Sequence, residues 1–95
     1  MKANFTFESI NDLQRLREFI EVKNPVAAER IANELLAGIE KLKIFPKIGL
    51  PVQRAQDPDL IRDLFISDYT VRYLISNEAI IILRFWHGKE IEKDL

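Results

Sequence analysis

Residues 60–90 read LIRDLFISDYTVRYLISNEAIIILRFWHGKE and give the clearest indication of the fold. It contains three successive runs rich in β-branched and aromatic residues, separated by Ser67-Asp68 and by a polar patch at residues 76–78. Such runs are typical of β-strands, and the two breaks carry turn-forming residues instead of helix caps. Each run is also too short and too interrupted to be a helix with one apolar stripe. The stretch therefore predicts three sequential antiparallel strands in a meander.

The residues before the meander predict a strand followed by a helix. Residues 3–7 alternate between apolar and polar side chains, which is typical of an edge strand. Ser9 is followed three residues later by Asp12, an acidic variant of the capping box, so the first helix is expected to begin at Ser9. The apolar positions of this helix recur at helical spacing at Ile10, Leu13, Leu16 and Ile20.

A second, longer helix is predicted from Pro25 to about Phe45, because Asn24-Pro25 both ends the first helix and suits the start of the next. So short a connection forces the two helices into an antiparallel hairpin. Pro46 ends the second helix, and the polar residues 52–59 form a loop leading to the meander. The sequence thus predicts an α+β fold of order β-α-α-β-β-β, with the N-terminal strand and the helical hairpin packed on one face of a small antiparallel sheet.

Length and composition restrict the classes of protein to which the chain can belong. Residues 1–95 suit a single domain with one core. The absence of cysteine excludes disulfides and cysteine-bound metals, and the net charge of −1 provides no overall basic field for nucleic acid. No apolar run approaches the ~20 residues of a membrane span, and the N-terminus lacks the apolar core of a signal peptide, so we expect a cytoplasmic protein. No phosphate loop, Ser/His/Asp set or metal-ligand cluster occurs, so neither a cofactor nor a metal is expected.

Several short motifs, taken in their order along the chain, resemble a known family. They are Leu42-x-x-x-Pro46-x-x-Gly49, Arg62-x-Leu64, Tyr69-x-Val71-x-Tyr73 and Ile82-Leu83-x-Phe85-x-His87. With the preceding strand and helical hairpin, this series is similar to the RelE/ParE superfamily of bacterial type II toxins, and most similar to its ParE branch. The resemblance covers nearly the whole chain. It implies a cytoplasmic toxin that a cognate antitoxin holds inactive and, for ParE, inhibition of DNA gyrase.

The RelE branch of the superfamily implies a different activity, the cleavage of messenger RNA on the ribosome. That reaction uses the ribose 2′-hydroxyl as nucleophile and needs a group that takes its proton, a group that protonates the leaving oxygen, and cations near the phosphate. The candidate catalytic residues are Arg62, Arg84 and His87, with Arg72 as a further cation. Several ribonuclease members carry a tyrosine just beyond the family's histidine, whereas no tyrosine follows Tyr73 here. The missing tyrosine counts against RNA cleavage.

Structural roles compete with catalytic roles at two of these residues. Arg62 suits a sheet arginine that is paired with Asp63 or Asp68 or stacked over Tyr73, and we favour that interpretation. His87 closes the last predicted strand. A lone histidine without a demonstrated partner is more often bonded to backbone at a strand end than catalytic.

The two sheet faces depend on the turn near Asn77, whose length the sequence does not fix. A two-residue loop would separate Arg72 from Arg84, whereas an odd-numbered loop would place them on one face. In the odd case, the face away from the helices holds the candidate partner-binding residues Arg72, Leu74, Ile80, Ile82, Arg84 and Trp86. The core then holds Val71, Tyr73, Ile75, Ile81, Leu83 and Phe85. Such an apolar face would be covered by an antitoxin segment or, within the chain, by residues 52–59 and the C-terminal tail.

Three functions remain open from the sequence alone. The first is a gyrase inhibitor without chemistry of its own, recognising gyrase through exposed positions on the helical hairpin and the last strand. The second is a ribosome-dependent endoribonuclease, and the third is a non-toxic module that only binds its antitoxin. By analogy, the antitoxin is a short protein with a DNA-binding N-terminal part and a C-terminal segment that folds on the toxin.

Overall fold

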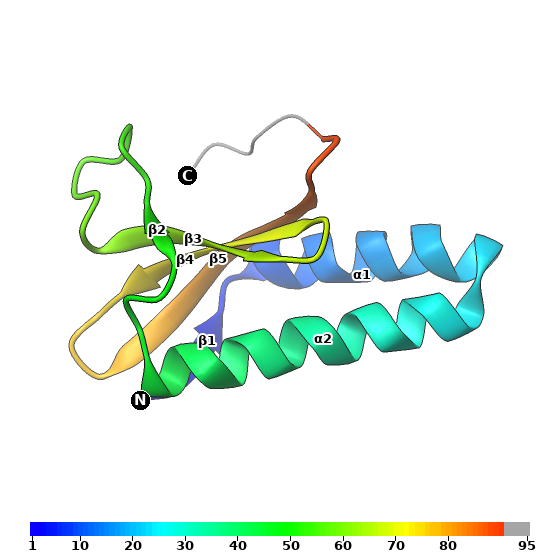
Figure 1. Ribbon diagram of the computed structural model, residues 1–95, viewed down its shortest axis with the longest axis horizontal. Coiled ribbons are helices and arrows are strands. Elements are labelled where there is room, and N and C mark those ends of the chain that lie inside the picture. Colours follow the sequence, from blue (N-terminus) through cyan, green and yellow to red (C-terminus); the bar gives the residue numbers. More distant parts are fainter. Residues whose placement is uncertain (91–95) are drawn as a thin grey trace.

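A helical hairpin lies against one side of a five-stranded sheet and projects beyond its end (Figure 1). The computed structural model describes residues 1–90. In chain order the elements are β1 (Lys2–Phe5), α1 (Phe7–Lys23), α2 (Pro25–Ile44), β2 (Leu50–Pro51), β3 (Ile61–Ile66), β4 (Tyr69–Ile75) and β5 (Ala79–His87). This series confirms the α+β class and the predicted order of elements. The two-residue strand β2 is an addition that the sequence did not indicate.

The sheet is mixed, with the strand order β1-β5-β4-β3-β2. Strands β3, β4 and β5 form the predicted antiparallel meander, and β2 pairs antiparallel with β3. Strand β1 lies in the sheet itself, parallel to β5 at the edge, so it extends the sheet instead of packing on its face. Beyond Phe5, Thr6 continues this edge by donating from its N–H to the Ile82 carbonyl and from its hydroxyl to the Leu83 carbonyl.

Helix α1 begins two residues earlier than predicted, because Thr6 and not Ser9 is its N-cap. The Thr6 hydroxyl oxygen accepts a hydrogen bond from the Ser9 N–H at 3.0 Å, while the Ser9 hydroxyl donates to the Thr6 carbonyl. Both are good cap residues, so composition alone did not choose between them. The predicted break at Asn24-Pro25 is confirmed: Asn24 ends α1, its side chain accepts from the Ala27 N–H, and Pro25 takes the first position of α2.

The core fills the space between the helical hairpin and the sheet. Its buried members are Leu16, Leu35, Ile39, Leu42, Tyr69, Val71, Tyr73, Ile80, Ile82 and Phe85. Burying each large apolar side chain contributes roughly 1.5–3 kcal/mol, so this layer supplies most of the driving force for folding. None of the helices within residues 1–90 combines the length and the apolar character needed to cross a lipid bilayer.

A β-bulge in β5 decides which side chains share a face of the sheet. At the turn, Ile75 pairs with Ile80, which leaves an even number of residues between them instead of the odd number considered above. Further along, Tyr73 pairs with Ile82 but Arg72 pairs with Arg84, so Leu83 is an extra residue in β5. The even turn alone would have placed Arg72 and Arg84 on opposite faces. The extra residue in the bulge reverses this, so Arg72 and Arg84 are register partners.

The even turn overturns the predicted division between core and open surface for the residues that precede the bulge. Ile80 and Ile82, expected beside Arg72 on the face without helices, are completely buried in the core under the helices. Ile81 and Leu83, expected in the core, are only partly buried, and Ile81 is the register partner of Leu74 on the opposite face. The other four predicted core residues, Val71, Tyr73, Ile75 and Phe85, do lie in the core or pack against it.

Candidate functional site: the open face of the sheet

The side of the sheet opposite the helices carries a connected set of polar and aromatic side chains, which we call the open face. Strand alternation and the β3–β4–β5 register place nine residues there: Ile61, Asp63, Phe65, Thr70, Arg72, Leu74, Ile81, Arg84 and Trp86. Phe65 is 58% exposed, whereas Thr70, Arg72 and Trp86 are buried. By this register, four of the six candidate partner-binding residues belong to this face: Arg72, Leu74, Arg84 and Trp86.

Arg72 is held between a carboxylate and an aromatic ring on the open face. Its Nε and Nη2 donate to the two carboxylate oxygens of Asp63, both at 2.8 Å. The guanidinium carbon lies 5.0 Å from the centre of the Trp86 ring, a cation–π distance. A bidentate pair of this kind fixes the orientation of both planar groups. Arg72 therefore acts as a cross-strand tie between β3, β4 and β5.

Arg84 lies at the bulge and, unlike Arg72, binds a helix. Its Nε and Nη2 donate to the carboxylate of Asp12 in α1, at 2.7 and 3.0 Å. The same carboxylate accepts the Phe85 N–H at 3.1 Å, a donor left without a strand partner because β1 ends at Phe5. The hydrogen bond to Asp12 raises the pKa of Arg84. Arg84 is thus committed to the junction between α1 and β5, although by strand register it is the partner of Arg72.

The same ion pair lowers the pKa of Asp12. Burial alone would raise the pKa of its carboxyl, but the hydrogen bonds from Arg84 and from the Phe85 N–H, together with the nearby guanidinium charge, outweigh burial and hold the pKa below the usual value of 3.8. From its spacing to Ser9, Asp12 was expected in a capping box at the start of α1. It lies instead within the helix, 5% exposed, at a position that faces β5.

Arg62 has the structural role that the sequence favoured, with different partners. Its Nε donates to the Asp59 carbonyl, its Nη2 to the Asp59 carboxylate and its Nη1 to the carbonyls of Lys47 and Gly49, at 2.8 to 3.2 Å. The predicted partners Asp63 and Asp68 do not contact it in these hydrogen bonds. Arg62 therefore joins the two loops on either side of β2 to β3.

Replacing Arg62 by lysine is expected to lower the free energy of unfolding by about 1–2 kcal/mol, because one ammonium cannot reach carbonyls on both loops. Urea denaturation followed by circular dichroism measures the change. Arg17→Lys is the matched control, since Arg17 is an exposed residue of α1 with a surface ion pair to Glu21. Equal stability of the two variants would contradict the structural role of Arg62.

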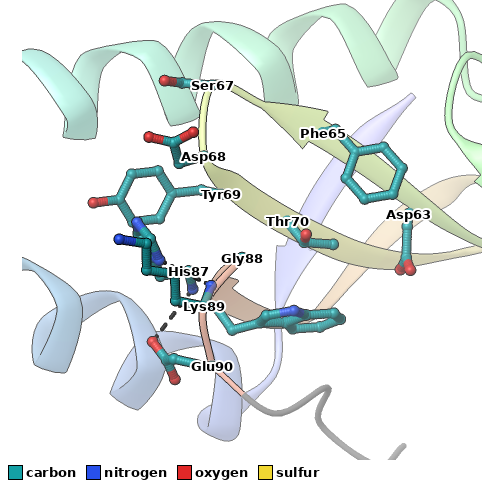
Figure 2. A pocket seen from close by; sticks show the side chains of 11 residues that line it. Asp63, Phe65, Ser67, Asp68, Tyr69, Thr70, His87, Gly88, Lys89 and Glu90 are labelled. Carbon is teal, nitrogen blue, oxygen red and sulfur yellow. Dashed lines mark hydrogen bonds between the residues drawn. The ribbon is translucent and has the colours of Figure 1, made fainter.

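A groove of about 650 Å³ opens where β3 and β5 end and β4 begins, and His87 lies in its wall (Figure 2). The groove is lined by Asp63, Phe65, Ser67, Asp68, Tyr69, Thr70, Trp86, His87, Gly88, Lys89 and Glu90. The His87 Nδ1 accepts a hydrogen bond from the Lys89 N–H at 3.0 Å, and its ring meets the Tyr69 ring edge-on at 5.1 Å. The histidine is thus bonded to backbone at a strand end, in agreement with the favoured interpretation.

The charges around this groove do not suit a phosphate. Its lining contains three carboxylates, on Asp63, Asp68 and Glu90, but only one lysine, Lys89. Asp63 is paired with Arg72, and Glu90 accepts two hydrogen bonds from Arg15 of α1. Among the described residues the lining thus offers a phosphate one lysine and no cluster of cations, so it supplies little of the electrostatic attraction that binding an RNA backbone needs.

Asp12 and Asp59 were not predicted as partners of Arg84 and Arg62, nor Glu90 as the partner of Arg15 in α1. One signal for Asp12 was present: it shares a helical face with Arg15 and with apolar residues, which is unusual for a solvated carboxylate. Nothing comparable marked Asp59 or Glu90. Residues 52–59, one segment expected to cover the open face, form an irregular loop as predicted. The other expected segment is the C-terminal tail, of which residues 91–95 lie outside the described residues.

Comparisons with known proteins agree with this architecture. Residues 4–92 match the family model described as the ParE toxin of the type II toxin–antitoxin system parDE. The chain is 25% identical over 87 residues to the toxin RelE2 of Caulobacter vibrioides, covering 92% of this chain and 94% of that protein. In fold it is similar to a chain of the chromosomal ParDE system from P. aeruginosa, with a TM-score of 0.75, 18% identity, and coverage of 92% of this chain and 95% of that one. Because the family model spans nearly the whole sequence, the chain belongs to the ParE family of toxins of type II toxin–antitoxin systems.

Proposed function

We propose that this toxin inhibits DNA gyrase by binding it, catalyses no reaction of its own, and is held inactive in the cytoplasm by a cognate antitoxin. Membership in the ParE family supports an antitoxin partner and makes gyrase the first target to test. The observation that carries the proposal is the pairing of all three strand arginines. Arg62, Arg72 and Arg84 are each bound to a carboxylate, of Asp59, Asp63 and Asp12 respectively.

This pairing bears on the chemistry of RNA cleavage. A ribonuclease of the RelE kind needs cations directed at the phosphate as negative charge builds on its oxygens. In this chain, freeing Arg62 or Arg84 for that purpose would break hydrogen bonds inside the fold and leave a carboxylate without its partner. The groove that His87 lines adds only one lysine, Lys89, for that role. A binding protein needs none of these groups to be free.

The alternative is ribosome-dependent cleavage of messenger RNA, favoured by one observation: the Caulobacter relative is named a RelE toxin. On that alternative Arg62, Arg84 and His87 would form the active site. A third possibility is a chain that binds its antitoxin but is not toxic. The three functions differ in which process stops first in a cell that produces the chain without its antitoxin.

We expect DNA synthesis to fall before protein synthesis within minutes of induction, and purified gyrase to lose supercoiling activity in the presence of the toxin. His87→Ala should retain both effects within about twofold, because His87 bonds to backbone and has no catalytic duty in this proposal. Pulse-labelling of DNA and protein is the measurement, with circular dichroism to verify that the variant is folded. If protein synthesis falls first and His87→Ala abolishes toxicity, the ribonuclease alternative replaces this one. Growth without arrest would favour the non-toxic module.

A further inference from the structure

The two edges of the sheet differ in how they are protected against pairing with another strand. At one edge, β2 has only two residues. Val52, which follows β2, donates to the Ile61 carbonyl, so by alternation the backbone nitrogen of Pro51 faces outward, where proline has no N–H to donate. A short strand with an outward proline blocks further pairing. The other edge, β1, has four residues in unbroken register with β5 and contains no proline.

The outward side of β1 offers the backbone groups of two residues. The N–H groups of Lys2 and Thr6 donate to carbonyls on the β5 side. Because successive residues of a strand direct their backbone groups to opposite sides, Ala3 and Phe5 direct their N–H and C=O groups away from β5. Within residues 1–90 the structure shows no hydrogen-bond partner for these outward groups. The occupant that satisfies such an edge is another β-strand.

We propose that β1 pairs with β1 of a second copy of this chain, antiparallel and about a two-fold axis at Asn4, so that the two sheets become one. In this register Ala3 of each copy lies opposite Phe5 of the other, and each pair exchanges N–H···O=C bonds in both directions. All outward groups of β1 are then satisfied. Pairing of β1 with β2 of another copy would build an open filament, which the short β2 and Pro51 disfavour.

Exposed apolar side chains flank this edge and match in the same register. Four of them are exposed by 36% or more: Met1, Phe5, Phe7 and Ile10. Phe5 stacks on the core residue Phe85, with ring centres 6.5 Å apart, so it lies on the helix side of the sheet. With the axis at Asn4, Met1 of one copy comes to the side of Phe7 of the other. Apolar surface is thereby buried at both ends of the paired strands.

The charged groups next to β1 also suit this arrangement. The end at Met1 carries the amino group, Lys2, Glu78 and the Lys43–Glu40 ion pair, whereas the end at Phe5 carries Glu8 and the Asp12–Arg84 ion pair. The first end is positive on balance and the second is negative. A two-fold axis at Asn4 brings the first end of one copy to the second end of the other, so opposite charges meet. Lys2 itself lies opposite Thr6 of the other copy and not opposite a second lysine.

Sedimentation equilibrium of the purified toxin at about 1 to 300 µM tests the proposal. The paired edges are short, so their interface is smaller than the roughly 1,600 Å² of a standard complex, and we expect a monomer–dimer equilibrium with a Kd on the order of 10 µM. Asn4→Asp should raise this Kd about fivefold or more, because two carboxylates then face each other across the axis. Asn33→Asp makes the same change at an exposed position of α2 and should raise it less than about twofold.

A cysteine on the axis gives a more specific test, since the chain contains none. Directly opposite residues of a non-hydrogen-bonded antiparallel pair have Cα atoms about 4.5 Å apart, within the range that a disulfide spans. Asn4→Cys should therefore form a disulfide-linked dimer on oxidation. Lys2→Cys is the matched control, exposed on the same strand, but about 13 Å from its own copy in this register. It should link at least about tenfold more slowly.

The outcomes also distinguish a second copy from other occupants of the edge. A toxin that stays monomeric to about 300 µM overturns the inference, as does equal linking of the two cysteine variants. A dimer whose Kd is the same in Asn4→Asp uses another face and overturns it as well. Native-state hydrogen exchange should show the amides of Ala3 and Phe5 exchanging more slowly at dimer-forming concentrations. If they are protected only when purified antitoxin is added, the edge belongs to the antitoxin and the inference is wrong.

The inference goes beyond the proposed function, because none of these measurements depends on gyrase. The groove at the ends of β3 and β5 contains no residue of β1 or of α1, so the paired copies leave it open. Failure of gyrase inhibition with an intact dimer would overturn the proposed target alone.

Discussion

Replacing Asp12 by alanine is expected to lower the free energy of unfolding by about 3 kcal/mol, a large part of the roughly 5–15 kcal/mol available to a domain of this kind. The carboxylate is 5% exposed and accepts three hydrogen bonds, from Nε and Nη2 of Arg84 and from the Phe85 N–H. Alanine leaves the guanidinium without its counter-charge and the N–H without an acceptor, in a junction that water reaches poorly.

Urea denaturation followed by circular dichroism measures this change, and two further variants identify its cause. Asp12→Asn keeps an oxygen that can accept from the Phe85 N–H, so it should be less harmful than Asp12→Ala. Arg84→Leu removes the other partner, and the double variant should cost less than the sum of the two single variants, because the ion pair is lost only once. Additive effects would show that Asp12 and Arg84 do not act as a pair.

The contribution of Asp12 to the free energy of unfolding should also depend on pH. Because the pKa of Asp12 is lower in the folded chain than its usual value, its contribution is fully present above about pH 4 and is lost as the pH falls through the lowered folded value. The stability difference between the unsubstituted protein and Asp12→Asn should therefore shrink on acidification below about pH 4. Exposed Asp59 also has a lowered pKa, through its hydrogen bonds from Lys47 and Arg62, but it titrates equally in both proteins and cancels in the difference.

The meander and the helical hairpin were predictable because each depends on local chemistry. Three strand-forming runs with short polar breaks favour antiparallel pairing between successive strands. Asn24-Pro25 separates the two helices because proline disfavours a helical conformation in the residue before it. The parallel pairing of β1 with β5 was not predictable in this way. It depends on where the hairpin returns the chain, which no local pattern in residues 1–7 encodes.

The faces on which the β5 side chains lie could not be predicted, for a different reason. Side-chain direction alternates along a strand, so a single extra residue moves every later side chain to the other face. Ile80 and Ile82 come before the bulge and were misplaced because the prediction assumed an odd-numbered turn, whereas the turn is even. Leu83 is the extra residue that then returns Phe85 and Trp86 to their predicted faces. The run Ile80–Leu83 is apolar at every position, so it contains no polar residue that could have marked the bulge.

The roles of the arginines were easier to predict than their partners. A guanidinium inside a sheet needs a carboxylate, which favoured a structural role for Arg62 from its position alone. Its partner Asp59 lies in the preceding loop, and the partner of Arg84 lies in α1, distant in sequence. Pairings of this kind follow from packing and are not visible in sequence spacing.

Gly49→Ala is expected to lower the free energy of unfolding by about 2–3 kcal/mol and the melting temperature by roughly 10 °C or more. A Cβ at Gly49 would lie 2.6 Å from the Tyr73 hydroxyl oxygen, 2.8 Å from its Cε1 and 2.9 Å from the Asp63 carbonyl oxygen. Tyr73 is completely buried and cannot move aside, because its hydroxyl donates to the Pro46 carbonyl at 2.6 Å and accepts the Gly49 N–H at 3.0 Å. The added methyl group therefore disrupts the contact between the end of α2 and the sheet.

Gly88→Ala is the matched control, since a Cβ there would meet only the Asp68 carbonyl oxygen at 3.2 Å in an exposed turn, and it should cost less than about 1 kcal/mol. Tyr73→Phe tests the mechanism. Removing the hydroxyl abolishes the closest of the three contacts, so Gly49→Ala should be less harmful in the Tyr73→Phe background than alone. The same cost in both backgrounds would refute a clash with the hydroxyl. The expected coupling gives the glycine of the Leu-x-x-x-Pro-x-x-Gly motif a physical reason: Pro46 supplies the acceptor for Tyr73, and Gly49 provides the space that its hydroxyl fills.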